Sequence, residues 1–267
     1  LRAPWQGQDK VGLLLPPSIG GALAAIAASL SGRTAVSLNF TVGQNAFDSA
    51  IRQAQLRTVV SSRAFLDKVK VAIPDGVTLL LLEDVLKDVG TTERLGALAR
   101  ALLLPLGGLE RACGATRKVA RDDVATILFS SGSTGEPKGV MLTHGNVQSN
   151  CDGVAQLIPL DHHDRLVGVL PLFHSFGNMA LWYAIQQGAG IVFHPNPLDA
   201  AAVGEITAQQ RATILLATPT FLQLYLRRCE PGQFGSLRLV LTGAEKLTDD
   251  LADAFADRFG IRPVQGY

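Results

Sequence analysis

Short apolar runs alternate with amphipathic segments along the whole chain, and this alternation constrains the fold more strongly than any other feature of the sequence. Most of the runs are continuously apolar, as in Leu166–Leu170. A strand that is apolar on both faces is buried on both faces, which is typical of a parallel sheet between layers of helices. The predicted strands are Val11–Leu15, Ala35–Leu38, Thr58–Ser61, Thr78–Leu82, Val124–Phe129, Leu166–Leu170, Gly190–His194, Thr213–Ala217, Leu237–Leu241 and Arg262–Gln265.

The predicted fold class is α/β, with mainly parallel sheets and helices on both faces in a three-layer αβα arrangement. The chain has 267 residues, of which 47% are hydrophobic and 18% are charged, and this composition supports a large buried core. We expect two packed lobes, lobe one at about 1–120 and lobe two at about 121–267. The stretch from Thr91 to Arg121 is the least strand-like part. It is predicted to be a helix and linker between the lobes, with an amphipathic membrane-surface helix as the alternative.

The charge and cysteine content argue against several classes of protein. The formal net charge is +1, and basic residues form no run interleaved with aromatic residues, so nucleic acid is not an expected partner. The three cysteines form no Cys-x-x-Cys pair and predict neither a metal site nor a disulfide framework, which fits a cytoplasmic protein. Pro16 and Pro17 divide the uncharged stretch 11–32 into a strand and a helix that are each too short to span a bilayer.

Several predicted helices have clear capping residues at their starts. Thr248 precedes two acidic residues and an apolar stripe that ends before Gly260. Thr218 precedes a proline, and Asp199 can cap a helix that runs to about Gln210. These residues predict helix boundaries, and we assign them no chemistry.

The stretch from Ser130 to Gly139 has the sequence SSGSTGEPKG and lies between a predicted strand and a helix that begins near Thr143. Small residues allow backbone N–H groups and hydroxyls to surround a polyphosphate, and Lys138 adds a positive charge. In a Walker A loop, lysine directly follows the second glycine and is itself followed by serine or threonine. Here glutamate and proline separate Gly135 from Lys138, and glycine follows the lysine, so a P-loop phosphotransferase is disfavoured.

This stretch resembles the phosphate-binding signature of the adenylate-forming superfamily, which includes acyl-CoA synthetases, luciferases and nonribosomal-peptide adenylation domains. The resemblance implies a two-step reaction with ATP and Mg²⁺. A carboxylate attacks the α-phosphate to give an acyl adenylate, and a thiol then displaces AMP. The resemblance also implies a catalytic role for Lys138, which would stabilise the charge of the departing pyrophosphate. The implied nucleotide-binding residues of the loop are Ser130, Ser131, Gly132, Ser133, Thr134, Gly135 and Lys138.

Three later segments also resemble motifs of this superfamily. Leu170–Gly177 resembles the second core motif, which implies that His174 is an active-site residue bordering the acyl pocket. His174 would act as a wall or gate and not as a general base, because the attacking carboxylate is already ionised. The turn Gly243-Ala244-Glu245 follows a predicted strand, where open α/β sheets bind ligands, and the resemblance places it beside the adenine and the acyl chain. Tyr267 would stack on the adenine, and the continuation of its motif would supply a threonine and a magnesium-binding glutamate.

The resemblance covers nearly the whole chain and implies a partial N-terminal AMP-binding domain, 1–267, without the small C-terminal domain. A narrower resemblance is carried by His194–Asp199 and Ala212–Phe221. These segments are similar to the synthetase part of bacterial bifunctional 2-acylglycerophosphoethanolamine acyltransferase/acyl-acyl-carrier-protein synthetases.

The narrower resemblance implies a fatty acid substrate, acyl carrier protein or coenzyme A as the thiol acceptor, and a role in phospholipid or fatty acid metabolism. It also implies membrane association at the cytoplasmic face of the inner membrane, through other parts of the full-length protein. The alternative is a non-catalytic relative that binds a nucleotide or an acyl group, or an inactive fragment of such a ligase.

Overall fold

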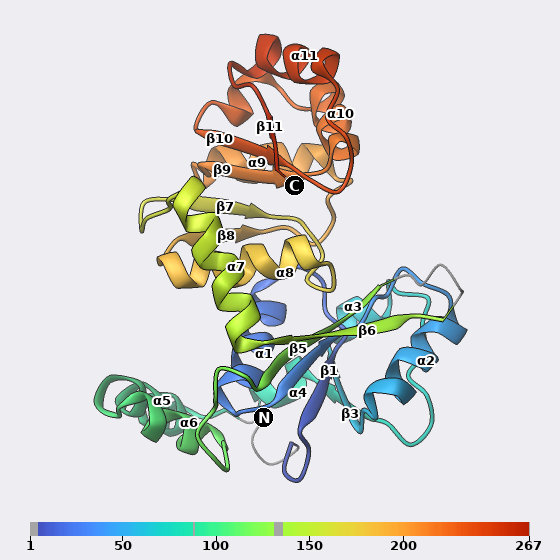
Figure 1. The fold of residues 1–267 in the computed structure, drawn as a ribbon, viewed down its shortest axis with the longest axis vertical. Coiled ribbons are helices and arrows are strands. Elements are labelled where there is room, and N and C mark those ends of the chain that lie inside the picture. Colours follow the sequence, from blue (N-terminus) through green and yellow to red (C-terminus); the bar gives the residue numbers. More distant parts are fainter. Residues whose placement is uncertain (1–4, 88, 131–135, 267) are drawn as a thin grey trace. The chain divides into compact units, whose positions relative to one another are not determined.

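The computed structural model describes residues 5–87, 89–130 and 136–266, and the chain divides into two compact units, Leu1–Gln148 (unit 1) and Ser149–Tyr267 (unit 2) (Figure 1). Each unit has its own sheet flanked by helices, which confirms the predicted fold class. The division falls within α7 (His144–Leu157), later than the predicted boundary near residue 120. Unit 1 extends beyond residue 120 because its sheet includes β5 (Val124–Ser130) and β6 (Lys138–Thr143).

The sheet of unit 1 has the strand order β4-β3-β1-β2-β5-β6. The pairings that join β4, β3, β1, β2 and β5 are parallel, whereas β6 runs antiparallel to β5. The other strands are β1 (Lys10–Leu13), β2 (Thr34–Ser37), β3 (Thr58–Ser61) and β4 (Thr78–Leu81). The helices of this unit before α7 are α1 (Ile19–Leu30), α2 (Gln44–Ala54), α3 (Arg63–Leu66), α4 (Leu82–Lys87), α5 (Thr91–Leu103) and α6 (Leu106–Cys113).

Two helices pack against the sheet of unit 1. α1 packs against β1 and β2 through small residues, and Ser18 caps it by accepting a hydrogen bond from the Gly21 backbone N–H at 3.1 Å. α2 buries Phe47 and Ile51 in a cluster that also contains Val36 and other strand residues. Burial of these side chains on the sheet is what stabilises such short strands and helices.

The sheet of unit 2 is parallel throughout the described residues and has the strand order β11-β10-β9-β7-β8. Its strands are β7 (Arg165–Gly168), β8 (Gly190–Phe193), β9 (Ile214–Ala217), β10 (Leu239–Thr242) and β11 (Val264–Gln265). Its helices after α7 are α8 (Ser175–Gln187), α9 (Ala200–Gln209), α10 (Pro219–Arg228) and α11 (Asp249–Phe259), with the 3₁₀ helix η1 (Pro231–Phe234) between α10 and β10.

Helices cover both faces of this second sheet. The face that carries Leu215 packs against α9, α10, η1 and α11, where Tyr225, Phe234 and Phe255 form a fully buried aromatic cluster. The opposite face, which carries Leu216, packs against α8. β9 is buried at every residue, as the continuous apolar run in the sequence predicts.

The three predicted caps of unit 2 are confirmed. Asp199, Thr218 and Thr248 each accept a hydrogen bond at their side-chain oxygen from the backbone N–H three residues later. α11 ends at Gly260 in the left-handed conformation, also as predicted.

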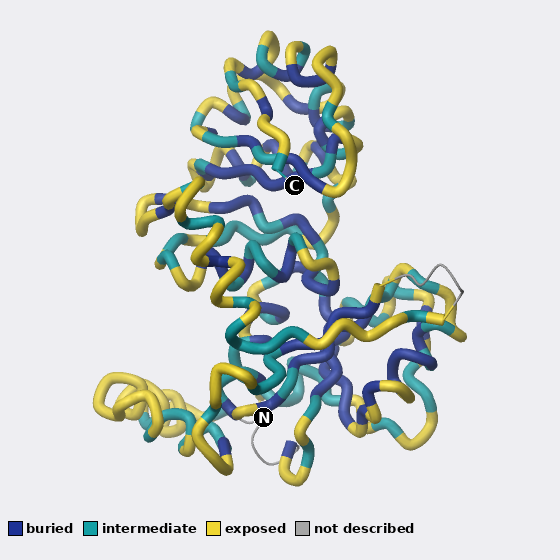
Figure 2. Tube along the Cα trace, in the orientation of Figure 1, coloured by how far each residue is buried: buried dark blue, intermediate teal, exposed yellow. Residues whose placement is uncertain are grey.

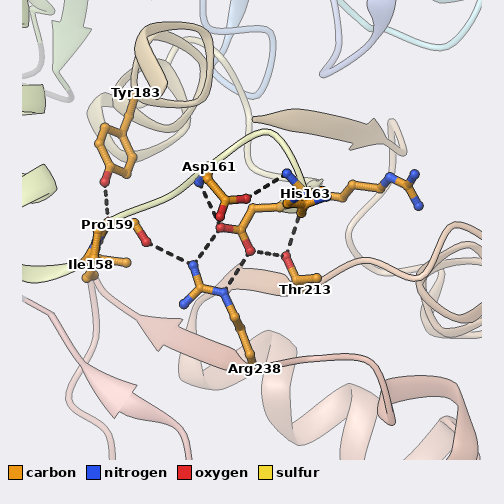
Figure 3. A network of polar contacts seen from close by, with 9 residues as sticks. Ile158, Pro159, Asp161, His163, Tyr183, Thr213 and Arg238 are labelled. Carbon is orange, nitrogen blue, oxygen red and sulfur yellow. Dashed lines mark hydrogen bonds and ion pairs between the residues drawn. The ribbon is translucent and has the colours of Figure 1, made fainter. Parts of the chain in front are cut away.

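Asp164 connects the amino ends of three strands of unit 2. Figure 3 shows its partners Asp161, Thr213 and Arg238 as sticks. Its side chain is 7% exposed and accepts two hydrogen bonds from the Arg238 guanidinium, at 2.8 and 2.7 Å. It also accepts one from the Thr213 hydroxyl at 2.7 Å and one from the Asp161 backbone N–H at 3.1 Å. These residues lie just before β7, β9 and β10, so one carboxylate fixes the start of each strand.

Two regions differ from the sequence-based expectation. The helix expected near Thr143 begins at His144, as predicted, but the strand β6, which the sequence did not predict, lies between the loop and this helix. The stretch from Thr91 onward forms the helix pair α5 and α6, and no residue of α5 is buried. None of the described helices is long and apolar enough to cross a membrane.

Candidate functional site

The hydroxyl-rich loop of the sequence connects the two antiparallel strands β5 and β6 of unit 1. Ser130, the last residue of β5, pairs in register with Lys138, the first residue of β6. The Ser130 hydroxyl donates a hydrogen bond to the Lys138 carbonyl at 3.4 Å. The loop is therefore the turn of a hairpin, and its two ends are fixed by the ladder between the strands. Five of the predicted site residues, Ser131, Gly132, Ser133, Thr134 and Gly135, lie outside the described residues.

The outgoing arm of this loop is anchored on α2. The Ser49 hydroxyl donates a hydrogen bond to a carboxylate oxygen of Glu136, and the Gln53 side-chain amide donates to the Pro137 carbonyl at 3.0 Å. Ser49 is buried, so its hydroxyl holds the glutamate from within the unit. Sequence reasoning did not identify Ser49 or Gln53, because neither belongs to a motif.

Lys138 is exposed at the outgoing end of the loop. None of the ion pairs formed between the described residues of the chain involves its ammonium group. The next residue, Gly139, packs so closely on the Phe129 ring that an added Cβ would lie 3.1 Å from it. The hairpin therefore presents a cation that forms no ion pair with the described carboxylates, next to a segment whose sequence is rich in small hydroxyl-bearing residues.

His174 lies after the carboxyl end of β7 and begins α8 as its N-cap residue, without a side-chain capping hydrogen bond. The residue is exposed and its ring lies against the Phe173 ring, with the centroids 4.8 Å apart. Partial removal from water lowers the pKa of the His174 imidazole below its ordinary value. The neutral ring therefore predominates near neutral pH, which suits a wall or gate better than a charged group.

Gly177 makes the tight start of α8 possible. A Cβ at this position would lie 2.3 Å from the Pro171 carbonyl oxygen and 2.8 Å from that of Leu170. Only glycine permits this approach of the helix to the loop that follows β7, and the same approach positions His174 at the edge of the sheet.

The turn after β10 is the second part of the site in unit 2. An added Cβ on Gly243 would lie 3.2 Å from the Phe176 ring, so this turn lies against the start of α8. Ala244 has a φ of 69°, in the left-handed region that non-glycine residues seldom adopt. Glu245 accepts hydrogen bonds at one carboxylate oxygen from the backbone N–H and the hydroxyl of Thr220, at 3.2 and 2.7 Å.

β11 holds the same turn from its other side. The Gln265 side-chain oxygen accepts a hydrogen bond from the Leu247 backbone N–H at 2.7 Å, and the Gly266 N–H donates to the Thr242 carbonyl at 2.8 Å. Sequence reasoning singled out none of Phe176, Thr220 and Gln265 for this contact. The remaining predicted residue, Tyr267, lies outside the described residues.

Within unit 2, the structure thus brings His174, Gly243, Ala244 and Glu245 to the carboxyl edge of one parallel sheet. This edge is where open α/β sheets bind ligands. Gly243 contributes no side chain, Ala244 is held in an unusual backbone conformation, and the Glu245 carboxylate is directed toward α10. In unit 1, the β5–β6 hairpin presents Lys138. The cation of unit 1 is suited to binding a phosphate, and the turn of small residues in unit 2 is suited to a flat ring.

Comparison with known proteins shows which family the chain belongs to. The sequence matches the AMP-binding enzyme family over residues 2–267. Feruloyl-CoA synthase of an Amycolatopsis species is 36% identical over 182 residues, covering 66% of this chain and 37% of that protein. 4-Coumarate–CoA ligase 4 of Arabidopsis thaliana is 26% identical over 268 residues, covering 94% of this chain and 45% of that protein. The chain thus spans less than half the length of these curated relatives.

Solved structures show the same fold. O-succinylbenzoate coenzyme A synthetase of Bacillus subtilis, solved in complex with ATP and magnesium, aligns with 97% of this chain and 49% of its own at a TM-score of 0.76 and 21% identity. The N-terminal domain of FACL13 from Mycobacterium tuberculosis aligns with 97% of this chain and 62% of its own at a TM-score of 0.72 and 24% identity. Because the family match spans nearly the whole sequence, the chain belongs to the AMP-binding enzyme family.

Proposed function

We propose that the protein containing this chain uses ATP and Mg²⁺ to convert a carboxylic acid to its acyl adenylate, and then transfers the acyl group to a thiol. The observation that carries the proposal is the β5–β6 hairpin, whose hydroxyl-rich loop ends at a lysine without a carboxylate partner among the described residues. In a family whose relatives are named as acid–CoA ligases, such a loop supplies the donors and the charge that a departing pyrophosphate needs.

Each part of the site has its own task in this proposal. Lys138 and the loop hydroxyls bind the β- and γ-phosphates. Gly243 and Ala244 leave room for a flat group at the edge of the second sheet, and Tyr267 stacks on the adenine. His174, neutral near neutral pH, borders the acyl group without taking a proton from it. Mg²⁺, when bound, would offset the negative charge of the triphosphate.

For the substrate we propose a fatty acid, with acyl carrier protein or coenzyme A as the thiol acceptor. The support is the resemblance of 194–199 and 212–221 to acyl-acyl-carrier-protein synthetases, which also underlies the proposed role in phospholipid metabolism at the cytoplasmic face of the membrane. Asp199 in the first of these segments and Thr218 in the second act as helix caps in the structure. The curated relatives include ligases named for aromatic acids, so aromatic acids are the competing substrates.

The test is ATP–pyrophosphate exchange by the intact protein, measured with fatty acids of several chain lengths and with ferulate and coumarate. Exchange with fatty acids but not aromatic acids supports the full proposal, and the reverse pattern retains the ligase but overturns the fatty acid. Binding of ATP without any exchange would instead indicate the non-catalytic relative.

Substitution of the lysine tests its role in the same assay. We expect Lys138→Ala to slow exchange by about 10²–10³, the typical cost of removing one preorganised charged donor, with little change in the Kd for the acid. Lys68→Ala, which removes another exposed lysine, is the matched control and should leave exchange unchanged. An equal loss in exchange and in acid binding would contradict the assigned role.

A further inference from the structure

The α5–α6 helix pair of unit 1 exposes a group of leucine side chains. No residue of α5 is buried, and Figure 2 shows α5 as exposed along its length. Leu95, Leu98, Leu102 and Leu103 are between 55% and 79% exposed. Leu106, at the start of α6, is 66% exposed. We call the helix pair, 91–113, the helical hairpin.

The exposed leucines form one stripe. Leu95, Leu98 and Leu102 are spaced by three and four residues and therefore lie on one side of α5. An isolated helix of this length is only marginally stable in water, and most helices gain their stability by burying an apolar face. A contiguous exposed apolar stripe of this kind marks an interaction surface.

The stretch of chain that carries the stripe is basic. The stretch 91–121 contains six basic and two acidic residues, a net charge of +4, whereas the whole chain carries +1. Arg117 is paired with Asp123, but none of the ion pairs between described residues involves Arg94, Arg100 or Arg111. Of the two acidic side chains, that of Glu93 is engaged with the Gly90 backbone N–H at the start of α5.

A groove beside the helical hairpin is lined by three basic residues and one acidic residue, Glu110. Arg111, Arg117 and Lys118 lie along this groove, together with the apolar side chains of Leu106 and Val119. Exposed leucines, together with Arg94, Arg100 and Arg111, which form no ion pair with the described residues, are complementary to a bilayer, whose interior is apolar and whose surface can be anionic.

We propose that the helical hairpin binds the surface of an anionic lipid bilayer. The leucine stripe enters the boundary between head groups and acyl chains, and the arginines and Lys118 contact lipid phosphates. α5 lies in the plane of the bilayer surface and does not cross it, because none of the described helices is long and apolar enough to span. This inference concerns a surface that the proposed function does not use.

The test is co-sedimentation of the intact protein with vesicles of phosphatidylcholine alone and of phosphatidylcholine mixed with phosphatidylglycerol. We expect binding to the anionic vesicles, weakening as salt is raised. The double variant Leu98→Gln, Leu102→Gln should lower the partition coefficient by roughly tenfold for each leucine. The matched control is Leu157→Gln in α7, which changes a leucine that is 83% exposed and should leave binding unchanged.

A second pair of variants separates charge from apolar contact. Arg94→Gln with Arg100→Gln should lower binding to anionic vesicles by roughly fivefold for each arginine and reduce the dependence on salt. Because all four positions are exposed, far-UV circular dichroism should show that the variants remain folded.

Several results would overturn the proposal. Equal binding of the wild type to neutral and anionic vesicles would do so, as would unchanged binding by the leucine variant. If no vesicle binds, and sedimentation velocity shows a dimer that the leucine variant dissociates, the hairpin is covered by a second copy of the protein and the lipid proposal is wrong.

Discussion

The carboxylate of Asp164 should contribute measurably to the stability of unit 2, and Asp164→Asn tests this. The hydrogen bonds from Arg238 are the largest of the effects that lower the pKa of the Asp164 carboxyl, from an ordinary value near 3.8 to about 2. For a fully buried pair, this difference would correspond to roughly 2.5 kcal/mol in the free energy of unfolding. Because the Arg238 side chain is 47% exposed, water screens part of the interaction, and we expect about 1–2 kcal/mol.

The sign of the pH dependence follows from the direction of the shift. The folded state keeps the Asp164 carboxyl ionised at a pH where the unfolded chain already binds a proton. Its contribution is therefore complete above about pH 5 and is lost as the pH falls toward 2. The difference in unfolding free energy between wild type and Asp164→Asn should be largest at pH 7 and shrink as the pH falls below about 4.

Urea unfolding followed by Trp182 fluorescence reports on unit 2 alone when Trp5, the tryptophan of unit 1, is replaced by phenylalanine in every variant. The matched control is Asp253→Asn, which breaks an exposed ion pair with Arg262 in the same unit and should cost less than about 1 kcal/mol. A loss for Asp164→Asn that is the same at pH 7 and pH 3, or no greater than that of the control, would refute the reasoning.

Two further substitutions test the local packing of the site. Gly177→Ala should lower the unfolding free energy of unit 2 by about 1–3 kcal/mol in the same assay, because its Cβ would meet two backbone carbonyls that cannot move aside. Gly153→Ala, in open space within α7, should instead be neutral or stabilising. Ser49→Ala releases Glu136 and should raise the KM for ATP in the exchange assay, whereas Ser62→Ala, which removes a hydroxyl that makes no capping bond, should not.

The sequence correctly predicted the strands and helix caps that depend on interactions between residues close together in the chain. The strand at 58–61 has the predicted bounds, and the caps Asp199, Thr218 and Thr248 act as expected, because each bonds to a backbone N–H only three residues away. The strand β6 was missed, because a run that begins Lys138-Gly139 and is exposed on one edge of the sheet carries little strand signal of its own. Its pairing with β5 is a tertiary interaction.

The partners of the motif residues could not be predicted, for a related reason. Ser49 meets Glu136 across 87 residues of sequence, and Thr220 meets Glu245 across 25. A serine or threonine in a helix is ordinary in composition, and only the folded chain shows which carboxylate it contacts. The motifs therefore predicted residue types and the edge of the sheet, but not the contacts that hold the motifs in place.

A glycine in a motif can serve the packing of the chain or leave space for a ligand, and one further pair of variants distinguishes these two roles for Gly243. Packing inside the chain explains why two of these residues are glycines. Gly139 lies against the Phe129 ring, and Gly177 lies against the Pro171 carbonyl. Gly243 has such a contact too, because its added Cβ would lie 3.2 Å from the Phe176 ring. A ring can shift by a few tenths of an ångström, so Gly243→Ala should cost only about 1 kcal/mol of stability.

The two roles of Gly243 are distinguished by combining Gly243→Ala with Phe176→Leu, which makes room for the added methyl group. If Gly243 serves only to accommodate Phe176, the double variant should recover the stability that Gly243→Ala loses and show a normal KM for ATP. If the glycine also makes space for the adenine, the KM for ATP should stay raised in the double variant although stability returns. We expect the second result, because the turn lies at the carboxyl edge of the sheet, and a return of the KM to the wild-type value would remove Gly243 from the nucleotide site.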